Sequence, residues 1–262
     1  MKNFKHDIML SCSLKYHGEK KCICRATQIG ADRLHGTAES ARVRGENSMK
    51  KEFSHVPETI DEKELYGFSW MEHVTAIPSP LLVVTSYKEN GKTNATMQSW
   101  STFANDNGFY CIFGSVYKGG HMYASIKQRG CLVINFPSAD IYAKCLKTIE
   151  NNGYENDEIE MSGLTAERAS LVDAPRIAEC FLSLECEYVW EKEIVPESGS
   201  VVMCVKVVNV CMEEDRFNAE KKGRYGESGY LYNIHSPRNP ETGKTEKTYI
   251  GILQKYKAEE EL

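Results

Sequence analysis

The sequence predicts a mainly β protein, an antiparallel barrel that is closed or partly closed, with a few short helices. Short segments rich in β-branched and aromatic residues recur along the chain, and turn signals such as Asn90-Gly91 separate them. The helical segments between them are few and short, which is typical of antiparallel barrels.

The first two predicted strands form a hairpin. Leu81–Tyr87 is apolar and β-branched, and Lys92–Gln98 returns after Asn90-Gly91. Asn-Gly supplies the positive φ angles of a type I′ turn, so a tight turn of that type is expected. A polar loop, Asn94 to Asn105, is expected to join this hairpin to the next strand.

The other elements follow from length and hydrophobic spacing. The predicted helices are Asp61–Glu72, His121–Gln128 and Ile141–Glu150, and the predicted strands are Phe109–Gly114, Cys131–Phe136, Phe181–Trp190, Val201–Cys211 and, as the last, Gly229–Ile234. Phe181–Trp190 alternates between apolar and polar residues, so one of its faces is expected to meet solvent. Val201–Cys211 is apolar on both faces, which indicates a central strand or an interface.

Composition narrows the class of protein. The 262 residues are 41% hydrophobic and 26% charged, with a net charge of −5, as in ordinary soluble globular proteins. No basic stripe indicates nucleic acid, and no apolar run approaches the roughly 20 residues that span a bilayer. No signal-peptide core follows the N-terminus, so a cytoplasmic location is expected.

Residues 1–48 differ from the rest of the chain. They carry nine Lys/Arg against five Asp/Glu, a net of +4, which leaves −9 for residues 49–262. Few of them are large and apolar, so we expect a disordered extension, with Met49-Lys50-Lys51 as a natural start of the folded domain. A mitochondrial-type presequence is the alternative, and the five acidic residues argue against it.

Ten cysteines are many, but seven lie from Cys111 onward, mostly among Val, Leu, Ile or Phe. They are expected to be buried as small hydrophobic residues rather than paired in disulfides. The other three, with two histidines, lack the paired spacing of a zinc module, so no metal site is expected; these residues are Cys12, Cys22, Cys24, His17 and His35.

Standard catalytic motifs are missing from the sequence. It contains no Gly-x-Ser-x-Gly elbow, no P-loop, no His-Glu-x-x-His and no Gly-x-Gly-x-x-Gly. The candidate chemistry therefore lies in two polar segments. Asn94–Thr102 offers hydroxyl and amide groups, and Trp100 could cover a flat ring. Lys118-Gly119-Gly120-His121 offers a positive charge, glycines that let the backbone approach an anion closely, and the start of a helix, which favours phosphate.

These segments resemble the flavin reductase-like family, whose fold is the FMN-binding split β-barrel, a Greek-key antiparallel barrel. The resemblance covers roughly Ile77 to Met212, and its pieces are Pro80–Thr85, the Asn94-Ala95 step into Ser99–Thr102, Lys118–Ile126, Val133–Ser138, Ala174–Glu179 and Leu184–Cys186. It is most similar to the flavoredoxin branch, in which a homodimer holds FMN near the subunit interface.

The resemblance implies the residues of an FMN site. Met97, Gln98, Ser99, Trp100, Ser101 and Thr102 would contact the isoalloxazine and ribityl parts, largely through backbone. Lys118 takes the place of the family's basic phosphate ligand. His121 stands where many members have Thr or Ser, and Asn135 is expected to be structural. No catalytic side chain is identified.

One departure concerns the reductant. Many flavin reductases carry Gly-Asp-His before the long strand, and this chain has Ser198-Gly199-Ser200 there. NAD(P)H as reductant is therefore in question, and exchange of electrons with a redox protein partner, as in flavoredoxin, is favoured. The resulting hypothesis is a cytoplasmic, homodimeric FMN-binding oxidoreductase.

Two other function classes stay open on the residues alone. A non-enzymatic split-barrel module would hold another phosphate-bearing ligand or haem, and haem would need an axial ligand such as His121 or His73. The last alternative is a structural or interaction protein without a cofactor.

Overall fold

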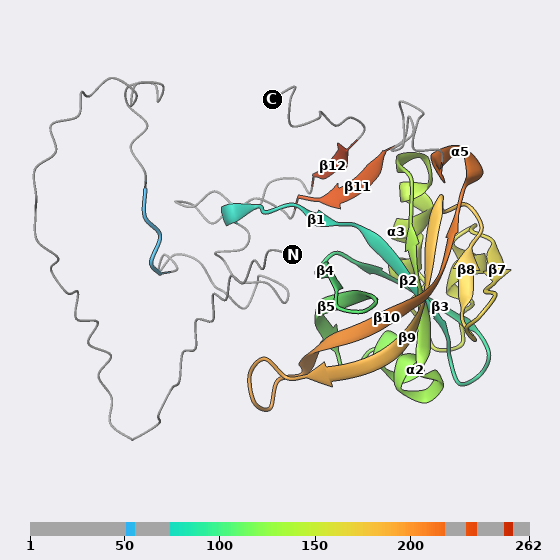
Figure 1. Ribbon diagram of the computed structural model, residues 1–262, viewed down its shortest axis with the longest axis horizontal. Helices are drawn as coiled ribbons and strands as arrows, with labels where there is room; N and C mark the ends of the chain where they lie inside the picture. The colour runs from blue at the N-terminus through green and yellow to red at the C-terminus, as the bar shows by residue number, and fades with distance from the viewer. Residues whose placement is uncertain (1–50, 56–73, 218–228, 235–248, 254–262) are drawn as a thin grey trace, which may run out of the picture. The chain divides into compact units, whose positions relative to one another are not determined.

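A computed structural model of the chain describes residues 51–55, 74–217, 229–234 and 249–253. Within the unit Glu52–Leu262, its main feature is a seven-stranded antiparallel sheet in the order β3-β2-β6-β9-β10-β5-β4 (Figure 1). The strands are β2 (Leu82–Tyr87), β3 (Thr93–Gln98), β4 (Ser101–Asn105), β5 (Phe109–Tyr117), β6 (Cys131–Phe136), β9 (Leu182–Lys192) and β10 (Ser200–Met212). Because β3 and β4 are its two edges, the barrel is open, and the predicted mainly β class is confirmed.

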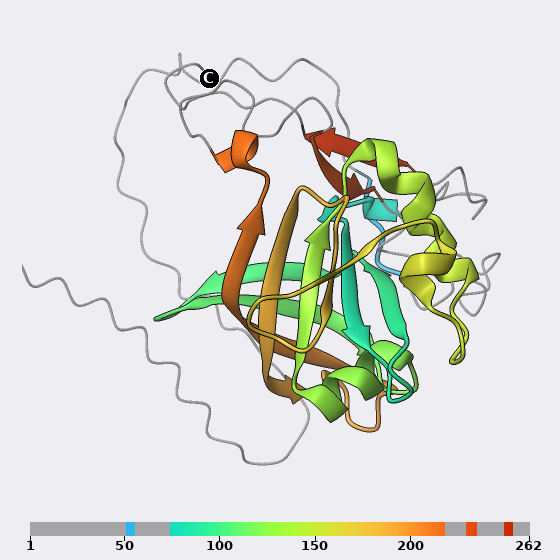
Figure 2. The ribbon, with the colours of Figure 1, turned by 90° about the vertical axis from the view of Figure 1, so that its right-hand side faces the viewer.

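Two smaller sheets and short helices complete the described fold. They are β1 (Ser79–Pro80) with β11 (Tyr230–Asn233) and β12 (Ile250–Leu253); β7 (Ala166–Arg168) with β8 (Pro175–Ile177); and α2 (His121–Arg129), η2 (Ala139–Ile141), α3 (Tyr142–Glu150), α4 (Glu158–Met161) and α5 (Glu214–Phe217). Figures 1 and 2 show α2 at one end of the large sheet and the β11–β12 hairpin at the other.

Two buried cores pack against opposite faces of β2. Leu82 and Val84 belong to the main core, which lies inside the curved sheet and which α2 covers with Ile126. Val83 faces the other way and belongs to a second core with Ile159 of α4. Successive side chains of a strand point to opposite faces, so the continuous apolar run of β2 is explained by burial on both sides.

The predicted helices agree with α2 and α3. α2 begins after Gly120 and ends at Gly130, whose φ of 70° is the left-handed conformation that terminates helices. α3 ends at Glu150 as expected, and the first residue of the predicted segment, Ile141, belongs to the 3-10 turn η2 that precedes it. Val201–Cys211 is also confirmed as a central strand, because β10 lies between β9 and β5.

Three expectations for the β-strands were wrong. Gly91 has a φ of 79° but Asn90 does not have a positive φ, so the first hairpin does not use a type I′ turn. Instead Lys88 N–H donates to Lys92 O over 2.9 Å, which is typical of a three-residue loop with a left-handed glycine. The expected polar loop from Asn94 to Asn105 is mostly β3 and β4, and Gly229–Ile234 is not the last strand, because β12 follows it.

The polar face of Phe181–Trp190 is buried over its first half and meets solvent only from Glu187 onward. Ser183 and Glu185 are both buried, because other polar groups cover this face of β9. Ser183 Oγ donates to Asn135 Oδ1 over 2.9 Å, and Glu185 accepts from the N–H groups of Ser170 and Leu171. Polar side chains with partners can be buried in a sheet, so the pattern misidentified the solvent face.

The cysteine prediction is confirmed where the structure describes the chain. All seven described cysteines are free thiols, and all but Cys211 are buried. The extension 1–48, the start at Met49 and the helix Asp61–Glu72 lie outside the described residues. Among the helices of the described residues, none has the length and apolar character to cross a membrane.

Candidate functional site

The two polar segments, residues 97–102 and the turn that begins at Lys118, are both next to β5. Residues 97–102 form the end of β3, the short connection Ser99-Trp100 and the start of β4. Trp100 O accepts from Gly114 N–H over 2.7 Å, and Gln98 Nε2 donates to Ser115 O over 3.3 Å. Both bonds attach the β3–β4 connection to β5, which leads directly to Lys118.

A short length of β5 separates the two segments. Lys118 follows Ser115 by three residues, about 10 Å at the rise of an extended chain. The structure therefore brings Gln98 and Ser99 to one end of this span and Lys118 to the other.

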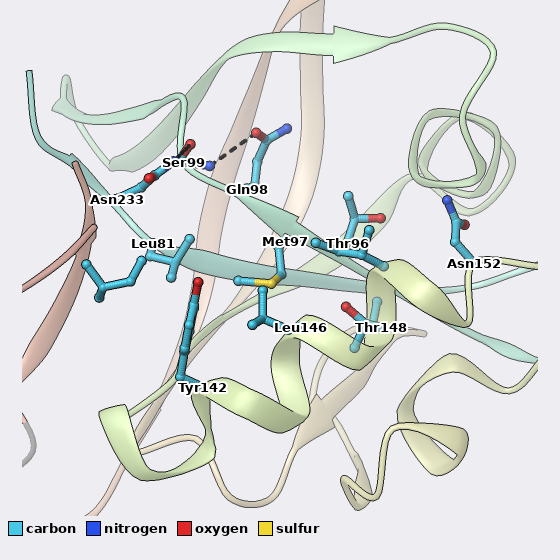
Figure 3. A pocket seen from close by; sticks show the side chains of 13 residues that line it. Leu81, Thr96, Met97, Gln98, Ser99, Tyr142, Leu146, Thr148, Asn152 and Asn233 are labelled. Carbon is cyan, nitrogen blue, oxygen red and sulfur yellow. Dashed lines mark hydrogen bonds between the residues drawn. The ribbon is translucent and has the colours of Figure 1, made fainter. Parts of the chain in front are cut away.

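A cavity of about 390 Å³ lies along β3, between its edge and α3 (Figure 3). Its apolar lining includes Met97, Tyr142 and Leu146, and its polar lining includes Ser99 and Asn233. Asp, Glu, Lys, Arg and His are all absent from the lining residues that the structure describes. The cavity thus suits a flat, uncharged group with hydrogen-bonding edges.

Hydrogen bonds hold the polar side of this cavity in place. Asn233 Nδ2 of β11 donates to Ser99 Oγ over 3.3 Å, and Ser99 N–H donates to Gln98 Oε1 over 3.2 Å. Figure 3 shows Met97 and Leu146 facing each other across the cavity, and Gln98 on the far side of β3 from α3. The small sheet β1-β11-β12 therefore supports the wall at Ser99.

The backbone of β3 adds a donor and an acceptor to this cavity. Ala95 N–H donates over 2.8 Å to Glu158 Oε2, which lies outside the large sheet. Alternate residues of an antiparallel edge strand turn their N–H and C=O groups the same way, so those of Met97 also point outward. Met97 lines the cavity, and its backbone can pair with the imide edge of a heterocycle.

The segment around Lys118 has the properties of an anion site. The N-cap of α2 is Gly120, which offers no side chain to cap the helix, and the first turn contains no acidic residue. Its N–H groups therefore carry the positive end of the helix dipole without an internal anionic partner. A Cβ on Gly119 would come within 2.7 Å of the Tyr117 ring, so a larger residue there would have to displace this exposed ring.

Lys118 itself has a carboxylate partner. Its Nζ forms an ion pair with Glu193 Oε1, from the connection between β9 and β10. The other oxygen of Glu193 accepts from Glu197 N–H over 3.1 Å. Hydrogen bonding from Lys118 is the largest reason that the pKa of Glu193 is below its ordinary value, so this carboxylate stays charged at neutral pH.

His121 faces a different cavity from the one that Met97 lines. This second cavity has a volume of about 310 Å³ and is also lined by Lys88 and Tyr154. His121 Nδ1 lies 3.6 Å from Glu158 Oε1, and that oxygen is 2.8 Å from Lys88 Nζ. His121 is thus separated from the Met97–Ser99 group, and its ring is directed at a buried ion pair.

Asn135 makes four hydrogen bonds inside the fold. Its side-chain N–H₂ donates to Val83 O and Thr85 Oγ1, and its oxygen accepts from Ile177 N–H and Ser183 Oγ. These bonds saturate the amide, which supports the structural interpretation of this residue.

Several residues of the site escaped the sequence interpretation. Tyr142 and Leu146 belong to a helix that was predicted, but nothing in the sequence indicates that they face β3 across a cavity. Asn233 and Glu193 are far from residues 97–118 in sequence, and only the folded chain brings them near.

One protein family and one curated protein are similar to this chain in sequence. The family described as "Flavin reductase like domain" matches residues 74–233, more than half of the chain. A protein of Aquifex aeolicus (strain VF5), described as uncharacterized, is 33% identical over 106 residues, 39% of this chain and 54% of that protein. The chain thus spans about half the length of this curated relative.

Solved structures with little sequence identity share the fold. Nitrilotriacetate monooxygenase component B from Bacillus cereus has a TM-score of 0.64 at 17% identity, over 80% of this chain and 100% of that one. Flavoredoxin of Desulfovibrio vulgaris (Miyazaki F) has a TM-score of 0.57 at 18% identity, over 70% of this chain and 90% of that one. These similarities establish the split-barrel fold.

Proposed function

Because this chain belongs to the flavin reductase-like domain family, we propose that it is an oxidoreductase that binds FMN between the β3–β4 connection and the start of α2. The observation that carries the proposal is the pairing of an uncharged cavity at Met97–Ser99 with an uncapped helix start beside Lys118. The uncharged cavity suits an isoalloxazine ring, and the helix start beside Lys118 suits a phosphate.

The ring would lie in the cavity along β3. Met97 and Leu146 provide apolar contact, and the outward N–H and C=O of Met97 can pair with the donor and acceptor groups of the pyrimidine edge.

The phosphate would lie at Lys118 and the first turn of α2. The missing N-cap side chain leaves backbone N–H groups for phosphate oxygens, and Lys118 adds a charge. His121 is a weaker candidate for this role, because its Nδ1 is directed at Glu158.

FMN, when bound, would supply the electron transfer through its ring system. The protein's residues would bind and orient the ring and exclude water from one of its faces, with the α3 side chains Tyr142 and Leu146 as that cover. No described side chain needs to act as a nucleophile or general base for this function. Electron exchange with a redox protein partner is the favoured mode, because this chain has Ser198-Gly199-Ser200 where many flavin reductases carry Gly-Asp-His.

A flavin-binding titration tests the proposal. The purified chain is titrated with FMN and with riboflavin, following the quenching of flavin fluorescence. We expect Lys118→Ala to weaken FMN about tenfold and to leave riboflavin unchanged, because a charge-assisted contact to phosphate is lost. Failure of the wild-type chain to bind either flavin contradicts the proposal, and NADH oxidation with FMN in excess distinguishes a reductase from a carrier.

A homodimer is part of the same proposal. Large apolar side chains are exposed along the β9–β10 hairpin, where a second copy of the chain would cover them: Val189, Trp190, Ile194 and Val195. Light scattering after size exclusion tests this, and Ile194→Asp should shift the protein to monomers. A wild-type mass of one chain contradicts the dimer.

A further inference from the structure

The β9–β10 hairpin places a carboxylate beside Lys118, the lysine of the proposed phosphate site. Glu193 follows β9 directly, and its carboxylate forms the ion pair with Lys118 Nζ. Lys118 N–H also donates to Gly199 O over 2.8 Å, so both ends of the connection 193–199 contact the Lys118 residue. Lys118 therefore offers an incoming phosphate little net charge.

Backbone contacts keep this carboxylate close to the site. Glu197 N–H donates to Glu193, and Glu197 has a φ of 62°, which turns the connection back toward β10. Ser198 N–H donates to Val195 O over 3.1 Å and closes a turn within the same segment. The carboxylate can leave Lys118 by a side-chain rotation, but the backbone keeps it nearby.

The ion pair is open to exchange. In a single chain the side chains of Lys118 and Glu193 are 36% and 37% exposed, so water and salt screen their attraction. A phosphate dianion attracts Lys118 more strongly than one carboxylate does, but it also meets the displaced charge of Glu193. A flavin without a phosphate, such as riboflavin, experiences neither effect.

We infer that Glu193 competes with the flavin phosphate for Lys118, and so makes FMN an exchangeable ligand rather than a permanently held one. This inference rests on the proposed function, because it takes Lys118 as the phosphate ligand. It assigns to Glu193 a specificity role: the residue reduces the preference for FMN over riboflavin. Among the described residues, Glu193 is the carboxylate that contacts Lys118.

The experiment compares Glu193→Gln with wild type in the same fluorescence titrations. Glutamine keeps the size and the hydrogen-bonding oxygen but removes the charge. We expect the Kd for FMN to fall about three- to fivefold, the size typical of partly exposed ion pairs, and the Kd for riboflavin to stay the same. Stopped-flow release of FMN should slow by a similar factor.

Glu197→Gln is the matched control, because it removes the same charge from the same connection and contacts Glu193 through its backbone N–H. It should leave both Kd values close to wild type. In a Lys118→Ala background, Glu193→Gln should lower the Kd for FMN by less than it does in wild type, because the competition for the lysine is gone and only the repulsion between Glu193 and the phosphate remains.

The outcomes separate this inference from the proposed function. An unchanged Kd for FMN in Glu193→Gln, equal shifts for both flavins, or an equal shift in Glu197→Gln overturns the inference while flavin binding stands. Wild-type protein that binds neither flavin overturns the proposed function and the inference with it.

Discussion

Lys88 and Glu158 form an ion pair of 2.8 Å at which both side chains are only 1% exposed. Lys88 Nζ also donates to Gly153 O over 2.7 Å and to Asn156 O over 2.8 Å, while Glu158 accepts from Ala95 N–H. The pair therefore ties the first hairpin to the segment before α4 and fixes the outer edge of β3, where the candidate flavin cavity begins.

Lys88→Ala is expected to destabilise the fold by about 3–5 kcal/mol, because it leaves the carboxylate of Glu158 buried without its partner. The measurement is the free energy of unfolding from urea titration. Lys92→Ala, an exposed lysine in the same hairpin, is the control and should change stability by less than about 0.5 kcal/mol.

A double variant shows whether the loss comes from the unpaired charge. Lys88→Met with Glu158→Gln keeps an acceptor for Ala95 N–H and removes both charges, so part of the stability should return. A double variant less stable than Lys88→Ala contradicts this explanation.

The ionised carboxylate of Glu185 should stabilise the fold at neutral pH, and this contribution should be lost in acid. Burial by itself raises the pKa of its carboxyl, but hydrogen bonds from Ser170 N–H, Leu171 N–H and Asn209, with Arg176 nearby, lower it below its ordinary value. A lowered folded-state pKa means that the contribution is complete above the unfolded pKa of about 4.3 and is lost as pH falls through the folded pKa.

Glu185→Gln should therefore cost most at neutral pH, about 1.5–3 kcal/mol for bonds to a charged group, and progressively less below pH 4. Urea unfolding at pH 7 and pH 3 measures both values. Glu187→Gln, an exposed carboxylate on the same strand, should show little difference from wild type at either pH. A cost for Glu185→Gln that is independent of pH contradicts the prediction.

Much of the fold could be predicted because its strands carry local signals. β2, β6 and β10 are apolar on both faces, and this pattern alone identified them as strands, with β10 as a central one. β4 was missed because Ser101–Asn105 is an edge strand of polar and small residues, whose pairing with β5 provides the order that its composition does not. β12 was missed although Ile250–Leu253 is mostly apolar, because four residues carry little periodicity and the strand is defined by its pairing with β11.

The candidate site was predictable only in part. Residues 97–102 and Lys118 were predicted from residue type and resemblance, and the structure attaches the β3–β4 connection to β5, which leads to Lys118. His121 was grouped with Lys118 because they are neighbours in sequence, but the first turn of α2 directs the imidazole toward Glu158 instead. Tyr142 and Asn233 reach the cavity through tertiary packing, which no local pattern encodes.

Leu146→Trp should block the cavity between β3 and α3. Leu146 is 38% exposed and lines the cavity, so an indole at this position would occupy space without disturbing a buried core. Both FMN and riboflavin should bind at least about tenfold more weakly, because the isoalloxazine ring they share is displaced. Fluorescence titration measures this, with Lys147→Trp on the exposed side of the same helix as the control.

Leu146→Trp should therefore weaken the binding of both flavins, whereas Lys118→Ala should weaken the binding of FMN alone. Unchanged affinity for both flavins in Leu146→Trp would mean that the ring binds somewhere other than this cavity.

The described cysteines should differ sharply in reactivity. Burial raises the pKa of Cys111 and of Cys145 to about 12, and those of Cys180 and Cys186 are also well above their ordinary value. The thiolate is the reactive form, so these side chains should resist alkylation both because they are covered and because they stay protonated. Cys211 is the described cysteine that is partly exposed.

Iodoacetamide treatment of the native protein at pH 8, followed by peptide mapping in a mass spectrometer, should therefore find Cys211 modified and Cys111, Cys145 and Cys186 intact. The same treatment in 8 M urea (about the concentration that unfolds most domains) should modify all of them, which shows that the protection comes from the fold. Rapid native modification of Cys145 would mean that the core between α3 and β3 opens, and would contradict the packing that forms one wall of the proposed flavin cavity.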